Sequence, residues 1–230
     1  SASVIRSRAA TAASVCSAFS ATFSTSSASL RRASARRRVE LSWADMAEEL
    51  AGRLSGVTVV ASGMLSNEDW SAFKALFVDV LKVQDLYFSA EPDQLGAQDD
   101  LLRRKDKVPN LMGAEALGLK SGSFDQLTKD LEAGKVQGLY IIERDLAKVW
   151  GETRAKSLLA KVPLVVLQGP NKGVLGDLVH YRLPATAYVE EEGRFTNFAG
   201  KIQSYKKALD PIGSARPDWE IFKLLQEARS

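Results

Sequence analysis

The feature that most constrains the fold is an apolar run that leads directly into a glycine-rich loop. Residues 162–167 are continuously apolar, a run that is too short to predict a helix and is typical of a strand buried on both faces of a parallel sheet. The loop that follows contains Gly169, Asn171, Lys172 and Gly173. Ligands and partners of open α/β sheets lie in the crevice beyond the carboxyl ends of the strands. The sequence therefore predicts a binding or interface site at these four residues.

Upstream of this run, short apolar runs alternate with helical periodicity. Residues 57–61 and 85–88 are predicted strands, and Ser66 begins a capping-box signature with Asp69 for a helix that continues to Leu81. This strand, helix, strand order indicates a right-handed parallel crossover. The first strand is not followed by the G-x-G-x-x-G pattern, so no dinucleotide site is predicted there.

The remaining segments complete an alternating pattern. Helices are predicted at residues 44–54, 124–131, 152–160 and 218–228, with a strand at Gly138–Ile142 and a solvated loop or short helix in the mixed-charge run 99–107. We therefore predict an α/β fold. It consists of a mainly parallel, doubly wound sheet with helices on both faces and a short irregular C-terminal tail.

The first 39 residues differ sharply in composition from the rest. They contain seven arginines, no lysine and no acid in a background of Ser, Ala and Thr, which is typical of a mitochondrial transit peptide. The alternative is a disordered arm that binds an anionic partner, since a low-complexity segment of this kind cannot bury a core. We expect a transit-like disordered segment over residues 1–39 and one α/β domain over residues 40–230.

The charge of the predicted domain differs from that of the whole chain. Residues 40–230 hold 24 of the 31 Lys and Arg residues and all 28 Asp and Glu residues, so their net charge is −4 although the chain carries +3. A weakly acidic domain lacks the basic face that drives phosphate binding, so nucleic acid is not an expected partner. No apolar run reaches about 18 residues, so no transmembrane span is expected.

Cysteine and histidine are too scarce for most metal chemistry. The single cysteine, Cys16, lies in the first 39 residues, so the domain has no thiolate for an iron–sulfur cluster or a Cys-held zinc. The single histidine, His180, excludes a two-histidine metal site, and no G-x-S-x-G elbow accompanies it. We interpret His180 as a strand-edge or interface residue, and we predict no catalytic residue and no metal ligand.

A family resemblance is carried by residues from Leu183 onward. The matching pieces are Leu183-Pro184, Glu191 and Gly193 before an aromatic, Asn197, Gly200-Lys201 before Gln203, and Asp218-Trp219. Together they resemble the closing part of the molybdopterin-oxidoreductase family. Within that family the chain is most similar to the 75 kDa subunit of mitochondrial complex I, the NADH-ubiquinone oxidoreductase. The resemblance spans residues 57–228 and is strongest after Leu164.

The resemblance implies two functions of different classes. The first is a structural, non-catalytic subunit, or half of a split subunit, of the complex I peripheral arm on the matrix side of the inner membrane, supporting electron transfer from NADH to ubiquinone. Its partners would be other peripheral-arm subunits, especially a chain with the iron–sulfur domains. The iron–sulfur clusters would then be bound by partner chains, and this chain would bind no cofactor. The alternative is the cofactor-binding part of a working molybdopterin enzyme, in which residues 169–173 would hold the phosphate of the pterin cofactor. The loop 168–184 lacks the Thr-Glu-Thr sequence usual in molybdenum-dependent relatives, and a leading Cys-rich region is absent.

The same resemblance adds Gly193, Asn197 and Lys201 to the candidate site residues. Gly193 can serve a turn after the preceding acidic run, where a positive φ would favour glycine. Asn197 can form an Asx turn, and Gly200 can serve a second turn. We expect these residues and the Gly169 loop to act by shape at an interface, because residues of these types are poor general acids and are not redox centres.

Overall fold

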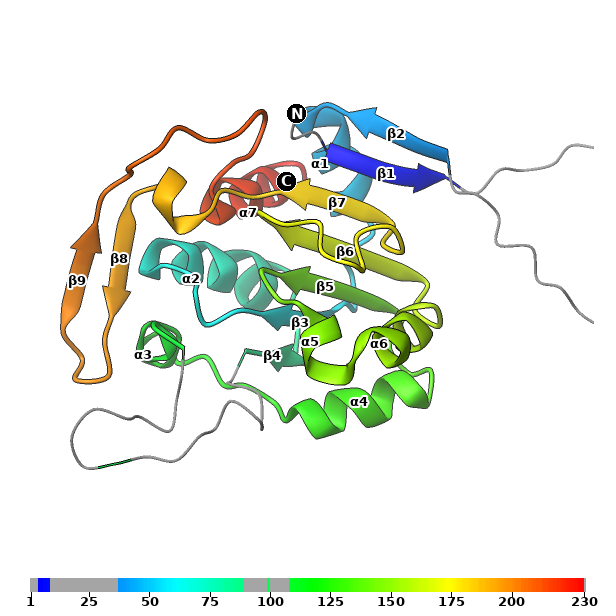
Figure 1. Cartoon of the computed structure of the whole chain (residues 1–230), viewed down its shortest axis with the longest axis horizontal. Coiled ribbons are helices and arrows are strands. Elements are labelled where there is room, and N and C mark those ends of the chain that lie inside the picture. The colour runs from blue at the N-terminus through cyan, green and yellow to red at the C-terminus, as the bar shows by residue number, and fades with distance from the viewer. Residues whose placement is uncertain (1–3, 9–36, 89–98, 100–107, 230) are drawn as a thin grey trace, which may run out of the picture.

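A seven-stranded sheet organises the computed structural model, which describes residues 4–8, 37–88, 99 and 108–229. The strands are β1 (Val4–Arg8), β2 (Arg37–Leu41), β3 (Thr58–Ala61), β4 (Leu86–Tyr87), β5 (Gly138–Ile142), β6 (Leu164–Gly169) and β7 (Tyr181–Pro184). Their order is β2-β1-β7-β6-β5-β3-β4 (Figure 1). The ladders from β7 to β4 are all parallel, and β1 is antiparallel to both of its neighbours. The predicted mainly parallel sheet is confirmed.

The chain reverses its direction across the sheet between β3 and β5. After β3 it runs outward to β4, then returns past β3 to β5 and continues through β6 to β7. The carboxyl ends beside such a reversal are separated by a crevice, because the connections that follow the two strands diverge. This topology places the loops after β5 and β6 at the edge of the sheet where a ligand site is expected.

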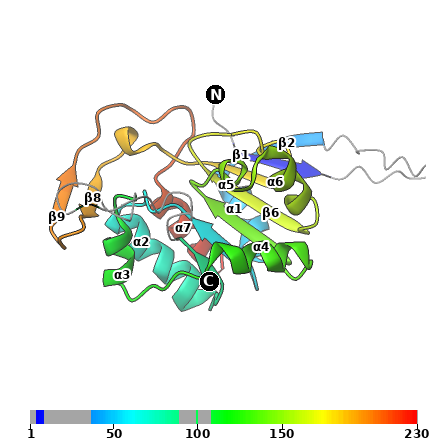
Figure 2. The ribbon, with the colours of Figure 1, turned by 60° about the horizontal axis from the view of Figure 1, so that its bottom comes forward.

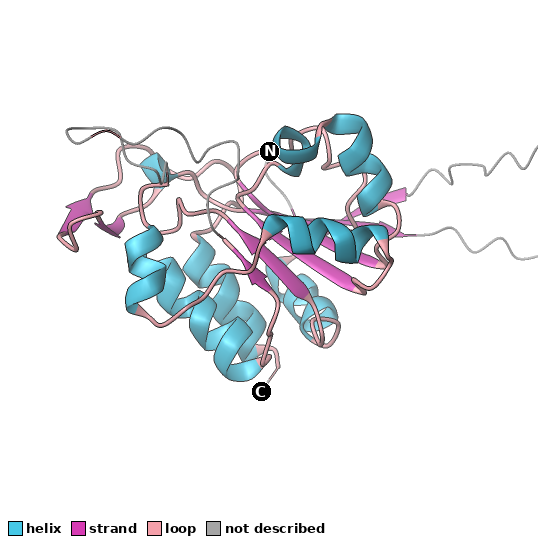
Figure 3. Cartoon of the chain, turned by 90° about the horizontal axis from the view of Figure 1, so that it is seen from below, coloured by secondary structure: helices cyan, strands magenta, loops and turns pink. Residues whose placement is uncertain are grey.

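Helices cover both faces of the sheet (Figures 1 and 3). One face carries α1 (Trp43–Ala51), α2 (Asn67–Phe73), the π-helix η1 (Lys74–Val80), α3 (Leu111–Ala116) and α7 (Asp218–Glu227). The other carries α4 (Phe124–Glu132), α5 (Leu146–Trp150) and α6 (Glu152–Leu159). Each face has its own cluster of buried hydrophobic residues, so the doubly wound prediction is confirmed.

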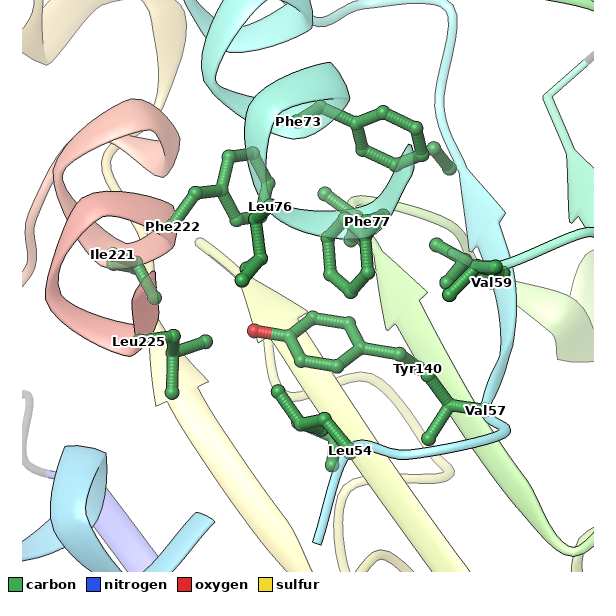
Figure 4. Packing of buried hydrophobic residues seen from close by; sticks show 14 of the residues in the cluster. Leu54, Val57, Val59, Phe73, Leu76, Phe77, Tyr140, Ile221, Phe222 and Leu225 are labelled. Carbon is green, nitrogen blue, oxygen red and sulfur yellow. The ribbon is translucent and has the colours of Figure 1, made fainter. Parts of the chain in front are cut away.

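Aromatic packing fixes α7 and η1 on the first face. Phe77 lies with its ring centroid 5.1 Å from that of Tyr140 and 5.6 Å from that of Phe222, and all three side chains are fully buried (Figure 4). Edge-to-face pairs at this spacing add to the stabilisation from burial. The N-terminal ends of α2 and α7 lie together near the carboxyl ends of the strands. They are joined by a hydrogen bond from Trp219 N to Asp69 Oδ1.

Local signals read from the sequence explain several element boundaries. Ser66 Oγ accepts from Asp69 N at 3.0 Å, and Asp69 Oδ2 accepts from Ser66 N at 2.8 Å, so the predicted capping box is confirmed. The helix continues to Val80 as expected, but from Lys74 it adopts π-helical hydrogen bonding. Gly134, with φ +68°, follows Ala133, the C-cap of α4, at the position where a left-handed glycine commonly ends a helix.

The two ends of the chain are more regular than expected. Val4–Arg8 forms β1 and pairs with β7 and β2, where we had expected a disordered segment. Without β1, the backbone groups on the outer edge of β7 would lack a strand partner, which is unfavourable at the edge of a sheet. Residues 9–36 lie outside the described residues, as does nearly all of the mixed-charge run 99–107. The targeting function and the domain boundary stay predictions.

The expected irregular tail contains a β-hairpin. Its strands are β8 (Gly193–Thr196) and β9 (Ile202–Tyr205), and it follows the 3-10 helix η2 (Tyr188–Glu190). The hairpin forms a separate two-stranded sheet that lies at one end of the molecule, beyond α2 and α3 (Figures 1 and 2). Chain segments after β7 therefore build a second, smaller layer next to the carboxyl edge of the main sheet.

Candidate functional site

A pocket of about 690 Å³ opens at the carboxyl ends of β5 and β6. Its walls include Met64 from the loop after β3, Glu143 after β5, and Tyr188 and Glu191 from the segment after β7. The predicted loop residues Gly169, Asn171, Lys172 and Gly173 all line it as well. The sheet topology thus brings this loop to the crevice where the sequence had placed a site.

Close backbone contacts shape the loop after β6. A Cβ atom at Gly169 would lie 3.5 Å from Glu143 Cα, and Gly169 O accepts a hydrogen bond from Ala185 N at 3.2 Å. Gly173 has φ +54°, a conformation that favours glycine. Lys172 Nζ lies 2.8 Å from Asp177 Oδ1, so this ammonium group is engaged by a carboxylate of its own loop.

Carboxyl groups form the floor of the pocket. Asp69 from α2, Glu143 and Glu191 line it, and buried Asp218 at the start of α7 interacts electrostatically with all three. Burial, together with repulsion from Asp69 and then Glu191, raises the pKa of Glu143 to about 8. Burial and the charge of Asp69 raise the pKa of Glu191 to about 7. These groups share one weakly solvated region, so each ionisation opposes the others.

Glu143 is held in a strained position. Its φ is +51°, which is uncommon for a residue with a side chain, and its backbone N–H donates to Gln168 O at 2.8 Å. Among the described residues, none forms a hydrogen bond with its carboxyl group, so burial is not offset and the neutral form is favoured.

Asp69 joins the two helices whose N-termini meet at the site. Its Oδ2 accepts from Ser66 Oγ at 2.5 Å, and its Oδ1 accepts from Trp219 N at 3.0 Å. Burial raises the pKa of Asp69, while these hydrogen bonds from Ser66 and Trp219 oppose the shift. Asp69 therefore caps α2 and also fixes α7 on it.

Asp218 ends a second buried chain of hydrogen bonds. Gln168 Nε2 donates to Asp218 Oδ1, and Gln168 Oε1 accepts from Tyr140 Oη at 2.5 Å. All three side chains are buried. Burial, followed by the charges of Glu143 and Asp69, raises the pKa of Asp218 well above its usual range. This network links β5, β6 and α7.

Glu191 connects the hairpin to the main sheet. Thr186 Oγ1 donates to Glu191 Oε2 at 2.8 Å, and Tyr205 Oη donates to Glu191 Oε1 at 3.1 Å. Burial and then the charge of Glu191 raise the pKa of Tyr205 above its usual range, so the phenol stays a donor. The carboxylate therefore receives hydrogen bonds from the segment after β7 and from β9.

The other three predicted site residues lie on the hairpin and do not line the pocket at β6. Asn197 Oδ1 accepts from Ala199 N and Lys201 N, both at 3.0 Å, which is the expected turn geometry. Gly193 is not a turn residue with positive φ, as we had expected, but lies within β8. A Cβ atom there would lie 2.7 Å from Tyr205 Oη, so a side chain at this position would displace the Tyr205 hydroxyl.

His180 has a structural role. Its side-chain Nδ1 accepts a hydrogen bond from Val165 N at 3.0 Å, and its backbone N–H donates to Val165 O at 2.8 Å. His180 immediately precedes β7, which lies between β1 and β6 in the sheet, and its interpretation as an interface residue stays a prediction. In the described part of the chain, no group of three or more His, Cys, Asp or Glu residues is placed to hold a metal ion. No helix among the described residues is long and apolar enough to cross a membrane.

Comparison with known proteins identifies the family. Residues 52–228 match the model of the molybdopterin oxidoreductase family. The chain belongs to this family. Similar relatives are a putative formate dehydrogenase of Staphylococcus haemolyticus, with 34% identity over 103 residues (44% of this chain, 10% of the relative), and the NADPH-Fe(3+) oxidoreductase subunit alpha of Geobacter sulfurreducens, with 33% over 97 residues (42% and 12%). An NADH-quinone oxidoreductase subunit of Escherichia coli is 29% identical over 102 residues (44% and 11%).

This molybdopterin-oxidoreductase domain spans only about a tenth of the length of these relatives, 10–12%. Among solved structures, acetylene hydratase from Pelobacter acetylenicus aligns with a TM-score of 0.39 and 18% identity over 45% of this chain and 15% of that one. The family assignment rests on the match over residues 52–228.

Proposed function

We propose that the chain is a structural, non-catalytic part of the peripheral arm of respiratory complex I and supports electron transfer from NADH to ubiquinone. The proposal is supported by family membership, by the similarity to the bacterial NADH-quinone oxidoreductase subunit and by the transit-like composition of residues 1–39. Its place is then the matrix side of the inner mitochondrial membrane. Its partners are other peripheral-arm subunits, above all a chain with the iron–sulfur domains, because residues 40–230 lack cysteine.

The chemistry of the pocket is the observation that carries the proposal. The alternative function requires this crevice to hold a phosphate-bearing pterin cofactor. Phosphate sites are built from backbone N–H groups at a helix N-terminus and from cations. Here the acidic floor contains Asp69, Glu143 and Glu191. Their raised pKa values mean that negative charge is unfavourable in this region.

The rim offsets the acidic floor only in part. Lys148, from α5, lines the pocket close to the start of that helix. No helix begins in the segment from Gly169 to β7, and Lys172 is paired with Asp177. The guanidinium carbon of Arg144 lies 5.0 Å from the ring centroid of Phe124, which engages that cation on α4. The lining thus has four acidic residues and three basic ones, two of which are engaged elsewhere. This is a poor fit for a phosphate-bearing cofactor, so we favour the scaffold function and assign no cofactor to this chain.

Native electrophoresis of mitochondrial membranes from cells that express the tagged full-length chain tests the proposal. We expect the tag to migrate with complex I activity, and metal analysis of the purified chain to find molybdenum far below one atom per chain. Migration of the tag apart from complex I, or about one molybdenum per chain, would overturn the scaffold function.

A further inference from the structure

The hairpin presents an outer strand edge. β8 lies between β9 and the body of the domain, because Arg194 N donates to Glu68 Oε2 at 3.0 Å and Thr196 N donates to Asn110 Oδ1 at 2.8 Å. Successive residues of a strand direct their backbone groups to opposite edges. In β8, Gly193 and Phe195 therefore bond to β9, opposite Tyr205 and Gln203.

It follows that Ile202 and Ser204 direct their N–H and C=O groups away from β8. In the described part of the chain, the strand order assigns β9 no second neighbour, and Figure 1 shows it as the outermost element on that side. An exposed row of backbone donors and acceptors can pair with another chain. Ile202, Gln203 and Ser204 are all exposed, so the edge is accessible.

Large apolar side chains surround this edge in the sequence. They are Phe198, Ile202, Leu209 and Ile212, which are 64%, 57%, 61% and 68% exposed. Four such residues within residues 198–212 are more than the scattered exposure usual on a protein surface and are typical of an interaction site. The same segment contains three lysines and one aspartate, so it is locally basic in a domain of net charge −4.

A lysine flanks β9 at each end. Lys201 immediately precedes β9 and Lys206 immediately follows it, and both are exposed. The complementary ligand is an extended segment with carboxylates near its ends and apolar side chains between them. A membrane surface is less suited to this edge, because lipid cannot satisfy the outward backbone groups of Ile202 and Ser204.

We propose that the outer edge of β9 accepts an extended acidic segment of the partner chain that carries the iron–sulfur domains, as a third strand of the hairpin sheet. This inference rests on the proposed function and adds the surface and the mode of contact. The backbone ladder supplies the register, while Ile202 and the neighbouring exposed side chains supply the apolar contact. Lys201 and Lys206 select for acidic residues at the ends of the added strand.

A proline substitution separates the outer edge from the hairpin's own ladder. Ser204→Pro removes an outward N–H and leaves the bonds from Gly193 and Phe195 to β9 in place, and proline is tolerated where the N–H faces outward. Ser204→Ala keeps the N–H and is the matched control. The charge-reversed variant Lys201→Glu/Lys206→Glu tests the same surface without a change in the backbone.

Each variant is expressed as the full-length tagged chain, and its co-purification with complex I is measured beside its thermal unfolding. We expect at least a tenfold loss of co-purified complex for Ser204→Pro and for the charge-reversed variant, with normal unfolding temperatures, and no loss for Ser204→Ala. Should the proline variant unfold, the charge-reversed variant decides the question. Wild-type recovery of complex I by a folded Ser204→Pro chain, or by the charge-reversed chain, would overturn the proposal.

Two further outcomes distinguish the alternatives. If the wild-type chain does not co-purify with complex I, the proposed function fails, and the assignment of this partner to β9 fails with it. If the wild-type chain instead sediments with vesicles of phosphatidylcholine and phosphatidylserine, and Phe198→Ser abolishes that binding, the surface is a membrane contact and the strand-addition proposal is wrong.

Discussion

Replacing Glu143 by glutamine should remove one of several contributions to the pH dependence of this domain's stability. The pKa of Glu143 is raised from 4.5 to about 8 by burial and by the carboxylates of Asp69 and Glu191. The folded state therefore binds a proton that the unfolded state has already released between these two pH values. The resulting stability is fully present below about pH 4.5 and is lost as pH rises to about 8.

The size of the effect follows from the shift. One pKa unit corresponds to about 1.4 kcal/mol, so the full shift sets an upper limit of roughly 5 kcal/mol. Glu143 is half-buried and lines a pocket, so solvent reduces this value, and we expect about 2–4 kcal/mol between pH 5 and pH 8. Glu191, whose pKa is raised to about 7, contributes in the same direction over a narrower range.

Urea unfolding of the full-length chain at pH 5, 6, 7 and 8 measures this change. We expect the wild-type free energy of unfolding to decrease by roughly 1–2 kcal/mol per pH unit above pH 5. Glu143→Gln should match the wild type at pH 5 and exceed it by about 2 kcal/mol or more at pH 8. The control is Glu192→Gln, which removes an exposed carboxyl group that does not line the pocket. A flat wild-type profile, or a Glu143→Gln protein less stable than the wild type at pH 8, would refute the reasoning.

Three other outcomes are expected. Gly193→Val should lower the free energy of unfolding, measured in urea, by roughly 1–3 kcal/mol and should reduce the amount of assembled complex I. The valine Cβ would displace Tyr205 Oη, which is only 2.7 Å from that position. Unchanged stability would contradict this packing. Asn197→Ala and Lys172→Ala should leave electron transfer per assembled complex near normal in an NADH:ubiquinone assay, whereas full assembly with lost transfer would assign them a chemical role. A reporter that carries residues 1–40 should enter mitochondria; a cytosolic reporter would refute the targeting prediction.

The fold was predictable where a local signal and the global packing agree. The capping box at Ser66 and the apolar run that becomes β6 each act within a few residues of sequence, and each occurs as expected. The loop at Gly169 could be placed for the same reason, since the end of a buried parallel strand fixes which edge of the sheet the loop occupies.

The acidic floor of the pocket could not be predicted, because its members are far apart in the sequence. Asp69 and Asp218 come together only when Trp219 N bonds to Asp69 across the interface of α2 and α7. Each residue has a local interpretation by itself, one as a helix cap and one as a first-turn acid. Glu143 directly follows β5, so its place at the carboxyl edge was the one available signal.

The hairpin was missed for a different reason. Its strands, β8 and β9, have four residues each, and β9 is mostly exposed. They are therefore too short to show a clear alternation of apolar and polar residues, which marks a half-buried strand. Gly193 was then assigned to a turn, although it lies in β8 and the Tyr205 hydroxyl occupies the space next to it. Contacts between β8 and the side chains of Glu68 and Asn110 position this element and cannot be read from its own residues.

Depletion of the chain from mitochondria tests the central claim most directly, with assembled complex I and its NADH:ubiquinone turnover quantified in the same membranes. A structural, non-catalytic subunit predicts that assembled complex decreases in proportion to the chain, while turnover per remaining complex stays at the normal value. Normal assembly with lost turnover would contradict this account, and so would normal assembly with normal turnover.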